Sequence, residues 1–172
     1  MVVINRSSGA FSTSNYTVDD VQRWFAEYHV DAKVFQVAGS EIAEKTRAAL
    51  MDQVDGIVVG GGDGTVGTVA GVLADGLTPM GILPLGTLNH FAKDMGIPLT
   101  MEEAVSAIAD LKTALVDVGE VNGEVFVNNS SIGGYPYTIL SRDWQQRQLG
   151  RNKWLAMAIS VFRFLKRFRV MD

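Results

Sequence analysis

The chain has 172 residues, of which 47% are hydrophobic and 20% are charged, and it carries a formal net charge of −4. A chain of this length builds one full core, or one domain and part of another, and its acidic balance argues against nucleic acid as a general partner. The absence of cysteine excludes disulfides and thiolate metal sites. Neither a signal peptide nor an apolar run long enough to span a membrane is visible, so we expect a cytoplasmic protein.

The first part of the chain alternates short apolar runs with helical patterns. Residues 1–5 are largely β-branched and lack polar alternation, which predicts a buried strand near the centre of a sheet. Thr17, with an acid three residues later, marks the start of a helix. Residues 32–37 predict a second strand, and Ser40 is the expected cap of a helix that runs to about Met51.

Two further strands each deliver a glycine-rich loop. The expected elements are a strand at 57–59, a glycine loop at 60–65, a helix at 66–73, a strand at 79–84, a second glycine loop at 85–90, a short helix at 91–95, and a helix from a Thr100–Glu103 capping box to about Leu111. Strands that alternate with helices at this spacing predict a parallel sheet with helices on both faces. We therefore expect an α/β domain over residues 1–113.

The pattern changes after residue 113. Val121-Asn122-Gly123-Glu124 predicts a β-hairpin with a type I′ turn, and residues 126–130 continue its second arm. Residues 133–150 show no regular pattern. We interpret residues 114–172 as part of a β-rich domain, and we expect the chain to be truncated, because two strands and a helix leave sheet edges and an apolar face uncovered.

The last stretch of the chain predicts an amphipathic helix. Its apolar stripe consists of Trp154, Ala158, Val161, Leu165 and Phe168. Its basic cluster consists of Arg163, Lys166, Arg167 and Arg169. Packing on its own domain is the favoured interpretation. Contact with an anionic membrane surface and self-association into a homo-oligomer stay open.

The loop Gly61-Gly62-Asp63-Gly64-Thr65 is the strongest functional signal. A strand, a glycine loop and a helix together present backbone N–H groups and a helix N-terminus to a phosphate. Asp63 would repel a bare phosphate, so we expect a metal ion or a reacting group beside it. The dinucleotide-binding and Walker A patterns do not fit, because the next strand carries no acid and no Gly-Lys-Ser/Thr follows. A tight turn that merely needs glycines is the structural alternative.

Two other loops are expected at the same edge of the sheet. Gly86, Thr87 and Asn89 follow the fourth strand, and Asn5 and Ser8 end the first. Open α/β sheets form their ligand crevice at the carboxyl ends of the strands. The three loops together therefore predict one cleft.

Two spaced motifs, Gly61–Thr65 and Pro84–Ala92, resemble the diacylglycerol kinase catalytic domain family. That family includes bacterial lipid kinases, sphingosine kinases and ceramide kinases, and it is more distantly similar to NAD kinases and phosphofructokinases. Asn5 and the stretch from Asp117-Val118-Gly119 to Asn128 also match its pattern. The resemblance runs from residue 1 to about 135.

The resemblance implies transfer of the γ-phosphoryl group of ATP to the hydroxyl of a diacylglycerol-like lipid, with Mg²⁺, by an α/β nucleotide-binding domain that precedes a β-sandwich. It implies a peripheral protein at the inner face of the membrane as one option. Asp63 would be catalytic and would act near the metal or the transferred phosphoryl group. The residues that would bind the nucleotide are Asn5, Gly61, Gly62, Gly64, Thr65, Gly86, Thr87 and Asn89.

The chain departs from the family pattern in three respects. Gly67 and Thr68 stand where Asn-Glu is common, and His90 stands where an aspartate is usual. The family's general base lies in an acidic motif of the β-domain, which we expect beyond Asp172, so that the isolated chain would be inactive or nearly so. Two alternatives stay open: a kinase for a soluble acceptor such as a nicotinamide dinucleotide, and a noncatalytic protein that binds nucleotide or lipid.

Overall fold

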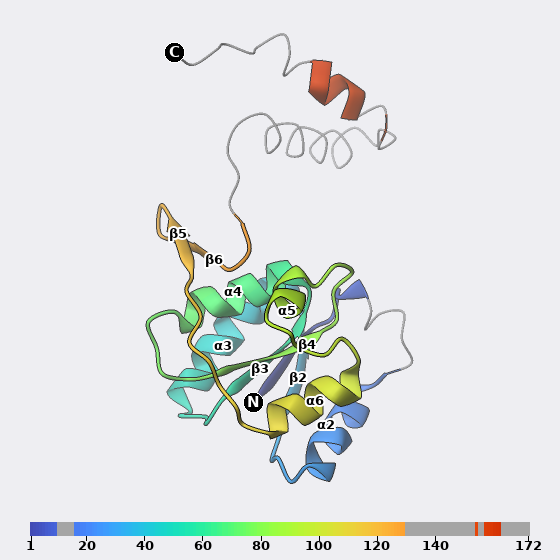
Figure 1. Cartoon of the computed structure of the whole chain (residues 1–172), viewed down its shortest axis with the longest axis vertical. Helices are drawn as coiled ribbons and strands as arrows, with labels where there is room; N and C mark the ends of the chain where they lie inside the picture. Colours follow the sequence, from blue (N-terminus) through green and yellow to red (C-terminus); the bar gives the residue numbers. More distant parts are fainter. Residues whose placement is uncertain (10–15, 130–153, 155–156, 163–172) are drawn as a thin grey trace. The chain divides into compact units, whose positions relative to one another are not determined.

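The computed structural model describes residues 1–9, 16–129, 154 and 157–162. By its contacts the chain divides into two units, Met1–Asn129 and Ser130–Asp172, and each is considered by itself. The first unit holds a four-stranded sheet flanked by helices, and a two-stranded hairpin (Figure 1).

The four strands of the larger sheet are all parallel. They are β1 (Val2–Asn5), β2 (Val34–Val37), β3 (Ile57–Gly61) and β4 (Met80–Pro84), in the order β2-β1-β3-β4. The predicted parallel α/β fold is confirmed. The predicted interior position of the first strand is confirmed as well, since β1 pairs with β2 on one side and with β3 on the other.

Helices cover both faces of this sheet, as predicted. They are α2 (Val18–Glu27), a 3₁₀ turn η1 (Gly39–Glu41), α3 (Ile42–Met51), α4 (Asp63–Leu73), α5 (His90–Asp94) and α6 (Met101–Ala109). Successive side chains of a strand point to opposite faces. Val2 and Ile4 accordingly pack with α2 and α6, whereas Val3 packs with α3, α4 and α5.

The helix starts predicted at Thr17 and Thr100 are confirmed, α4 begins at Asp63 instead of residue 66, and the cap predicted at Ser40 is wrong. Thr17 and Asp20 do form the predicted reciprocal capping box at α2. Ser40 is not a cap, because the Glu41 carboxylate accepts the Ala38 N–H at 2.7 Å and closes a 3₁₀ turn that contains Ser40. At α6 the hydroxyl of Thr100 donates to its own capping-box partner instead of accepting a backbone N–H, so the predicted box is not made there.

The predicted hairpin forms within the first unit. Strands β5 (Gly119–Val121) and β6 (Glu124–Phe126) are antiparallel. The turn residues Asn122 and Gly123 have φ of 54° and 81°, the positive values that a type I′ turn needs. The hairpin packs against α4, where a Cβ added to Gly71 would lie 3.6 Å from the Cβ of Val125. The start of a β-rich domain at residue 114 stays a prediction.

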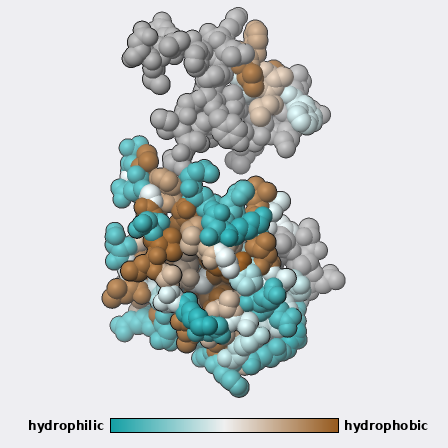
Figure 2. Space-filling model, viewed as in Figure 1, coloured by the Kyte–Doolittle hydropathy of each residue, from teal (hydrophilic) through white to brown (hydrophobic). Residues whose placement is uncertain are grey.

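The segment that leads from α6 into the hairpin is rich in exposed hydrophobic residues. They are Leu111, Leu115, Val116, Val118 and Val121. Figure 2 shows the corresponding brown surface beside the hairpin.

In the second unit, residues 154 and 157–162 are helical, and Trp154, Val161 and Phe162 are exposed. The predictions for residues 133–150, for Leu165 and Phe168, and for the basic cluster lie outside the described residues. Within the described parts of the chain, no helix is long and apolar enough to cross a membrane.

Candidate functional site

The loops that follow β3 and β4 meet through glycines. Gly61 at the end of β3 pairs with Pro84 at the end of β4, so the two loops start side by side. A Cβ on Gly62 would lie 3.1 Å from the Cα of Gly86, and a Cβ on Gly86 would run into the Gly62 backbone. Real Cβ atoms essentially never come as close to a neighbour as a Cβ on Gly86 would, and the contact at Gly62 is tighter than nine in ten real ones. Glycine at both positions is therefore what allows the two loops to touch.

Thr65, in the first turn of α4, ties that helix to the end of β1. Its hydroxyl accepts a hydrogen bond from Asn5 Nδ2 at 2.9 Å, and Asn5 Oδ1 accepts the Ser7 N–H at 3.0 Å. A Cβ on Gly61 would lie 2.5 Å from the Cβ of Thr65, so Gly61 makes room for this side chain. The structure thus brings Asn5 and Thr65 together beside the carboxyl ends of β1 and β3. The single cleft formed with the second loop stays a prediction.

Asn89 shapes the second loop from within. Its backbone has a left-handed φ of 51°, which asparagine tolerates better than most residues. Its Oδ1 accepts the Gly86 N–H at 2.9 Å, and its Nδ2 donates to Pro84 O at 3.1 Å and to Gly86 O at 2.9 Å. Both amide hydrogens are therefore used inside the loop, and the side chain acts by holding the loop's shape.

The end of β1 also lies next to the second loop. A Cβ on Gly9 would lie 3.6 Å from the hydroxyl of Thr87. Ser8 beside it is buried, and its Oγ has no hydrogen-bond partner among the described residues. Buried hydroxyls normally find a partner, so an added ligand with acceptor oxygens suits this position.

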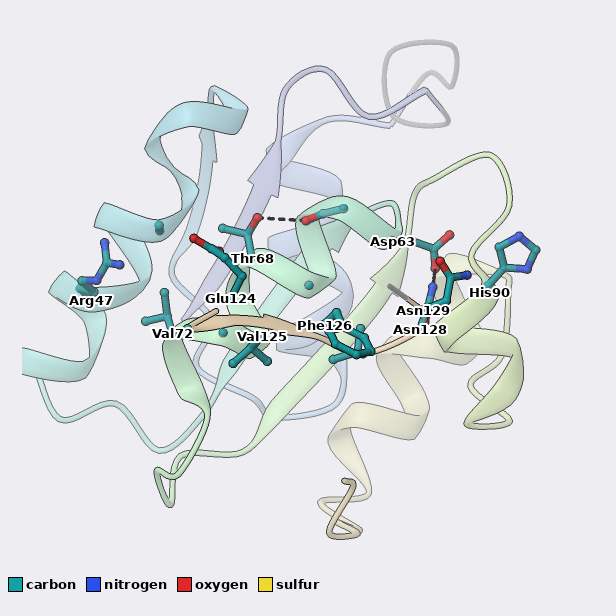
Figure 3. A pocket seen from close by; sticks show the side chains of 16 residues that line it. Arg47, Asp63, Thr68, Val72, His90, Glu124, Val125, Phe126, Asn128 and Asn129 are labelled. Atoms are coloured by element: carbon teal, nitrogen blue, oxygen red, sulfur yellow. Dashed lines mark hydrogen bonds between the residues drawn. The ribbon is translucent and has the colours of Figure 1, made fainter. Parts of the chain in front are cut away.

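Asp63 begins α4 and stands at the junction of three segments. Its Oδ1 accepts the Phe91 N–H at 3.0 Å. The same atom accepts the Asn128 Nδ2–H at 3.0 Å (Figure 3). Partial burial works to raise the pKa of Asp63. The hydrogen bonds from Phe91, Asn128 and the His90 N–H, together with the positive charge of His90, outweigh it and hold the pKa below the usual value. The carboxylate is therefore ionised at neutral pH.

A groove of about 740 Å³ runs from Asp63 along α4 beneath the hairpin. Figure 3 shows Asp63, His90 and Asn128 toward one end of the groove and Arg47 and Glu124 toward the other.

Two glycines on the α4 side of this groove leave open space. A Cβ on Gly64 or Gly67 would meet nothing within 4 Å. Glycine costs a helix interior about 1 kcal/mol relative to alanine, and packing among the described residues gives no reason for either one. Thr68, the neighbour of Gly67, donates its hydroxyl to Gly64 O at 2.9 Å. The first turns of α4 therefore present bare backbone to the groove.

The described residues suit a Mg²⁺ ion that is bound jointly by the protein and by the phosphates of a ligand. The described residues include no group of three or more histidine, aspartate and glutamate side chains that would hold a metal alone. Mg²⁺ is commonly bound through one or two carboxylates together with substrate phosphates. Asp63, ionised and next to the bare N-terminus of α4, supplies one such carboxylate, and its Oδ2 takes part in neither the Phe91 nor the Asn128 hydrogen bond.

One residue of this site has no role predicted from the sequence. Asn128 is expected from the sequence as part of the hairpin's second arm and of the stretch that matches the family pattern, without a role of its own, and its amide reaches Asp63 across 65 residues of chain. The signal available was weak: a polar amide just past the end of a short strand. His90 heads α5, is exposed and lines the same end of the groove.

Comparisons with known proteins agree on one family. Residues 1–121 match the family model of the diacylglycerol kinase catalytic domain. Two similar proteins are each named "Probable lipid kinase YegS-like", one from Yersinia pestis (strain Pestoides F) and one from Yersinia pseudotuberculosis (strain IP 31758). Each is 36% identical to this chain over 111 residues, which is 62% of this chain and 34% of the relative.

Solved structures give the same result. A crystal structure of a diacylglycerol kinase from Bacillus anthracis (strain Sterne) superposes with a TM-score of 0.59 at 26% identity, over 74% of this chain and 47% of that one. The chain therefore spans about a third of the curated relatives it matches and less than half of the matched structure.

Proposed function

Because the chain belongs to the diacylglycerol kinase catalytic domain family, we propose that it forms the nucleotide-binding part of an ATP-dependent lipid kinase. Such an enzyme transfers the γ-phosphoryl group of ATP to a lipid hydroxyl. The observation that carries the proposal is the contact between Gly62 and Gly86, which sets two glycine loops against each other beside the Asp63 carboxylate.

In this proposal the phosphates of ATP lie against the N-terminus of α4. The missing side chain of Gly61 makes room for Thr65, and those of Gly62 and Gly86 let the two backbones approach each other. The space beside Gly64 is filled by no described residue, and a phosphate would use it. Anions are favoured at a helix N-terminus because unpaired backbone N–H groups point toward them. Thr65 and Thr87 offer hydroxyls, and Asn5 and Asn89 act indirectly by holding the loops in place.

Asp63 is the residue that would hold Mg²⁺, together with phosphate oxygens. When bound, the ion supplies positive charge that offsets the phosphate charge during transfer. The chain's own part is to keep the Asp63 carboxylate ionised and fixed, which the hydrogen bonds from Phe91 and Asn128 do. Preorganised charge of this kind is what phosphoryl transfer mainly requires.

Titration calorimetry of ATP into the 172-residue chain, with and without Mg²⁺, tests this assignment. We expect ATP to bind and to bind more tightly with Mg²⁺, and we expect Asp63→Asn to remove the Mg²⁺ effect while the chain stays folded. Asp75→Asn is the matched control, since Asp75 lies exposed beyond the other end of α4. Absence of Mg²⁺-dependent ATP binding by the unaltered chain would overturn the assignment.

The acceptor requires a separate experiment. No residue of this chain is assigned as the general base, so labelled ATP is best supplied to one of the longer relatives, in native form and with Asn in place of the aspartate that matches Asp63. Diacylglycerol, sphingoid and ceramide lipids are offered beside NAD. Labelling of a lipid supports the proposal, labelling of NAD supports the soluble-acceptor alternative, and no labelling at all favours a noncatalytic nucleotide-binding protein.

The helix that includes residues 157–162 extends the proposal to the membrane. The exposed Trp154, Val161 and Phe162 are side chains suited to the interface of a lipid bilayer. Sedimentation of the chain with vesicles containing anionic lipid tests peripheral binding, and analytical ultracentrifugation without lipid tests the alternative of self-association. A monomer that leaves the vesicles unbound would contradict both.

A further inference from the structure

Two of the hydrogen bonds to Asp63, both to its Oδ1, come from distant parts of the chain. The Phe91 N–H belongs to the backbone of α5, so its direction is set by that helix. The other donor is a side chain, Asn128 Nδ2, which lies two residues past the end of β6. Asn128 is therefore the donor that a substitution removes without altering the backbone.

The position of Asn128 is fixed by packing elsewhere on the same hairpin. Val125 of β6 lies against the bare backbone of Gly71 in the last part of α4. Asn128 then meets Asp63, the first residue of the same helix. The second arm of the hairpin thus follows α4 from Gly71 back to Asp63 and contacts the helix at both ends.

The hydrogen bond between Asn128 and Asp63 is a poor candidate for a purely stabilising one. Asn128 is exposed, and the bond itself lies at the surface of the groove. Hydrogen bonds open to water contribute little net stability, because water replaces the lost partner. Fixing the orientation of the carboxylate is an effect that does not depend on burial.

We propose that Asn128 is a positioning residue for Asp63: its amide holds Oδ1, so that Oδ2 is kept for a bound metal ion. This inference rests on the proposed function, in which Asp63 holds Mg²⁺ with ATP. Hydrogen bonds to a metal-binding carboxylate commonly govern the affinity of its site, and their loss costs roughly ten- to a hundredfold. The hairpin then has a role at the phosphate loop that its turn and strands alone do not suggest.

The test compares Asn128→Ala with Asn129→Ala in the 172-residue chain. Asn129 is the next residue, is also exposed and lines the same groove, but it has no hydrogen bond to Asp63. ATP affinity is measured with and without Mg²⁺, and melting temperature is measured without either. We expect Asn128→Ala to weaken ATP binding about tenfold when Mg²⁺ is present. Without Mg²⁺, its ATP affinity and its melting temperature should be close to those of Asn129→Ala.

A second measurement needs no metal or nucleotide. In the free chain, Asp63→Asn should shift the side-chain amide NMR signals of Asn128 and leave those of Asn129 in place. Equal Mg²⁺ dependence in the two alanine variants, or an Asn128 signal indifferent to Asp63→Asn, would overturn the positioning role. If the unaltered chain shows no Mg²⁺-dependent ATP binding, the proposed function fails instead, and the NMR result still decides whether the contact exists.

Discussion

Gly62 and Gly86 lie so close that a side chain at Gly86 would overlap the Gly62 backbone and one at Gly62 would be crowded against Gly86. A Cβ on Gly62 would come within 3.1 Å of the Gly86 Cα, and a Cβ on Gly86 would also lie 2.6 Å from Asn89 Oδ1. The same Oδ1 accepts the Gly86 N–H. The contact between the loops and the hydrogen bonds inside the second loop therefore depend on one another.

Gly86→Ala should force the two loops apart. We expect it to lower the free energy of unfolding by about 1–3 kcal/mol, the usual cost of overpacking, and to weaken ATP binding. Gly67→Ala is the control, because its Cβ would meet nothing within 4 Å, and it should raise the free energy of unfolding by up to about 1 kcal/mol. Urea denaturation measures both, and an equal effect of the two substitutions would contradict the described loop contact.

The hydrogen bond from Asn5 to Thr65 links the first strand to the first turn of α4. A double-mutant cycle with Asn5→Ala and Thr65→Val should give a coupling of about 0.5–1.5 kcal/mol in the free energy of unfolding. The same cycle with Thr87→Val in place of Thr65→Val serves as control, since Thr87 makes no hydrogen bond to Asn5. Coupling of the same size in both cycles would show that the Asn5–Thr65 bond is not the cause.

Asp20 predicts a pH dependence of stability. The hydrogen bond from the Thr17 hydroxyl, then that from the Thr17 N–H and the pairing with Arg23, lower the pKa of Asp20. The unfolded chain has the ordinary aspartate pKa of about 3.9, so it binds more protons than the folded chain in the acid range. The stabilisation is therefore fully present above that value and is lost as pH falls through the lowered folded pKa.

Asp20→Asn should remove this contribution. Unfolding measured from neutral to strongly acidic pH should show the variant less stable than the native chain near pH 7, with the difference shrinking as the pH falls. Asp19→Asn is the control, because Asp19 lies in the same first turn of α2 and takes no hydrogen bond from Thr17. A difference that persists unchanged at acid pH would contradict the role given to the ionised carboxylate.

The strands, the loops and the hairpin could be predicted because local chemistry decides them. Residues 2–4 are apolar on both sides of the strand, and Asn122-Gly123 suits only a turn with positive φ. The predicted cap at Ser40 is wrong because Ser40 lies inside a 3₁₀ turn, which the Glu41 carboxylate closes by accepting the Ala38 N–H. The pairing of Asn128 with Asp63 could not be predicted, because it depends on how a hairpin packs along α4, and no local pattern carries that information.

His90 offers a last test of the metal assignment. It is exposed at the start of α5, and its positive charge helps to lower the pKa of Asp63. A carboxylate at this position would repel Asp63 in the metal-free chain and would give Mg²⁺ a second ligand, which suits its preference for one or two carboxylates. His90→Asp should therefore lower the melting temperature without Mg²⁺ and increase the stabilisation that Mg²⁺ with ATP produces.

We expect that stabilisation to exceed the native chain's by about 2–4 °C, the shift that 1 kcal/mol gives in a protein of this size. His29→Asp is the matched control, because His29 is the other histidine, is exposed, and lies in the turn after α2 with a φ of 60° that aspartate also tolerates. Thermal unfolding with and without Mg²⁺ and ATP gives the comparison. If His90→Asp gains no more from Mg²⁺ than His29→Asp does, the metal does not bind beside Asp63 and α5, and the assignment of Asp63 as its ligand is wrong.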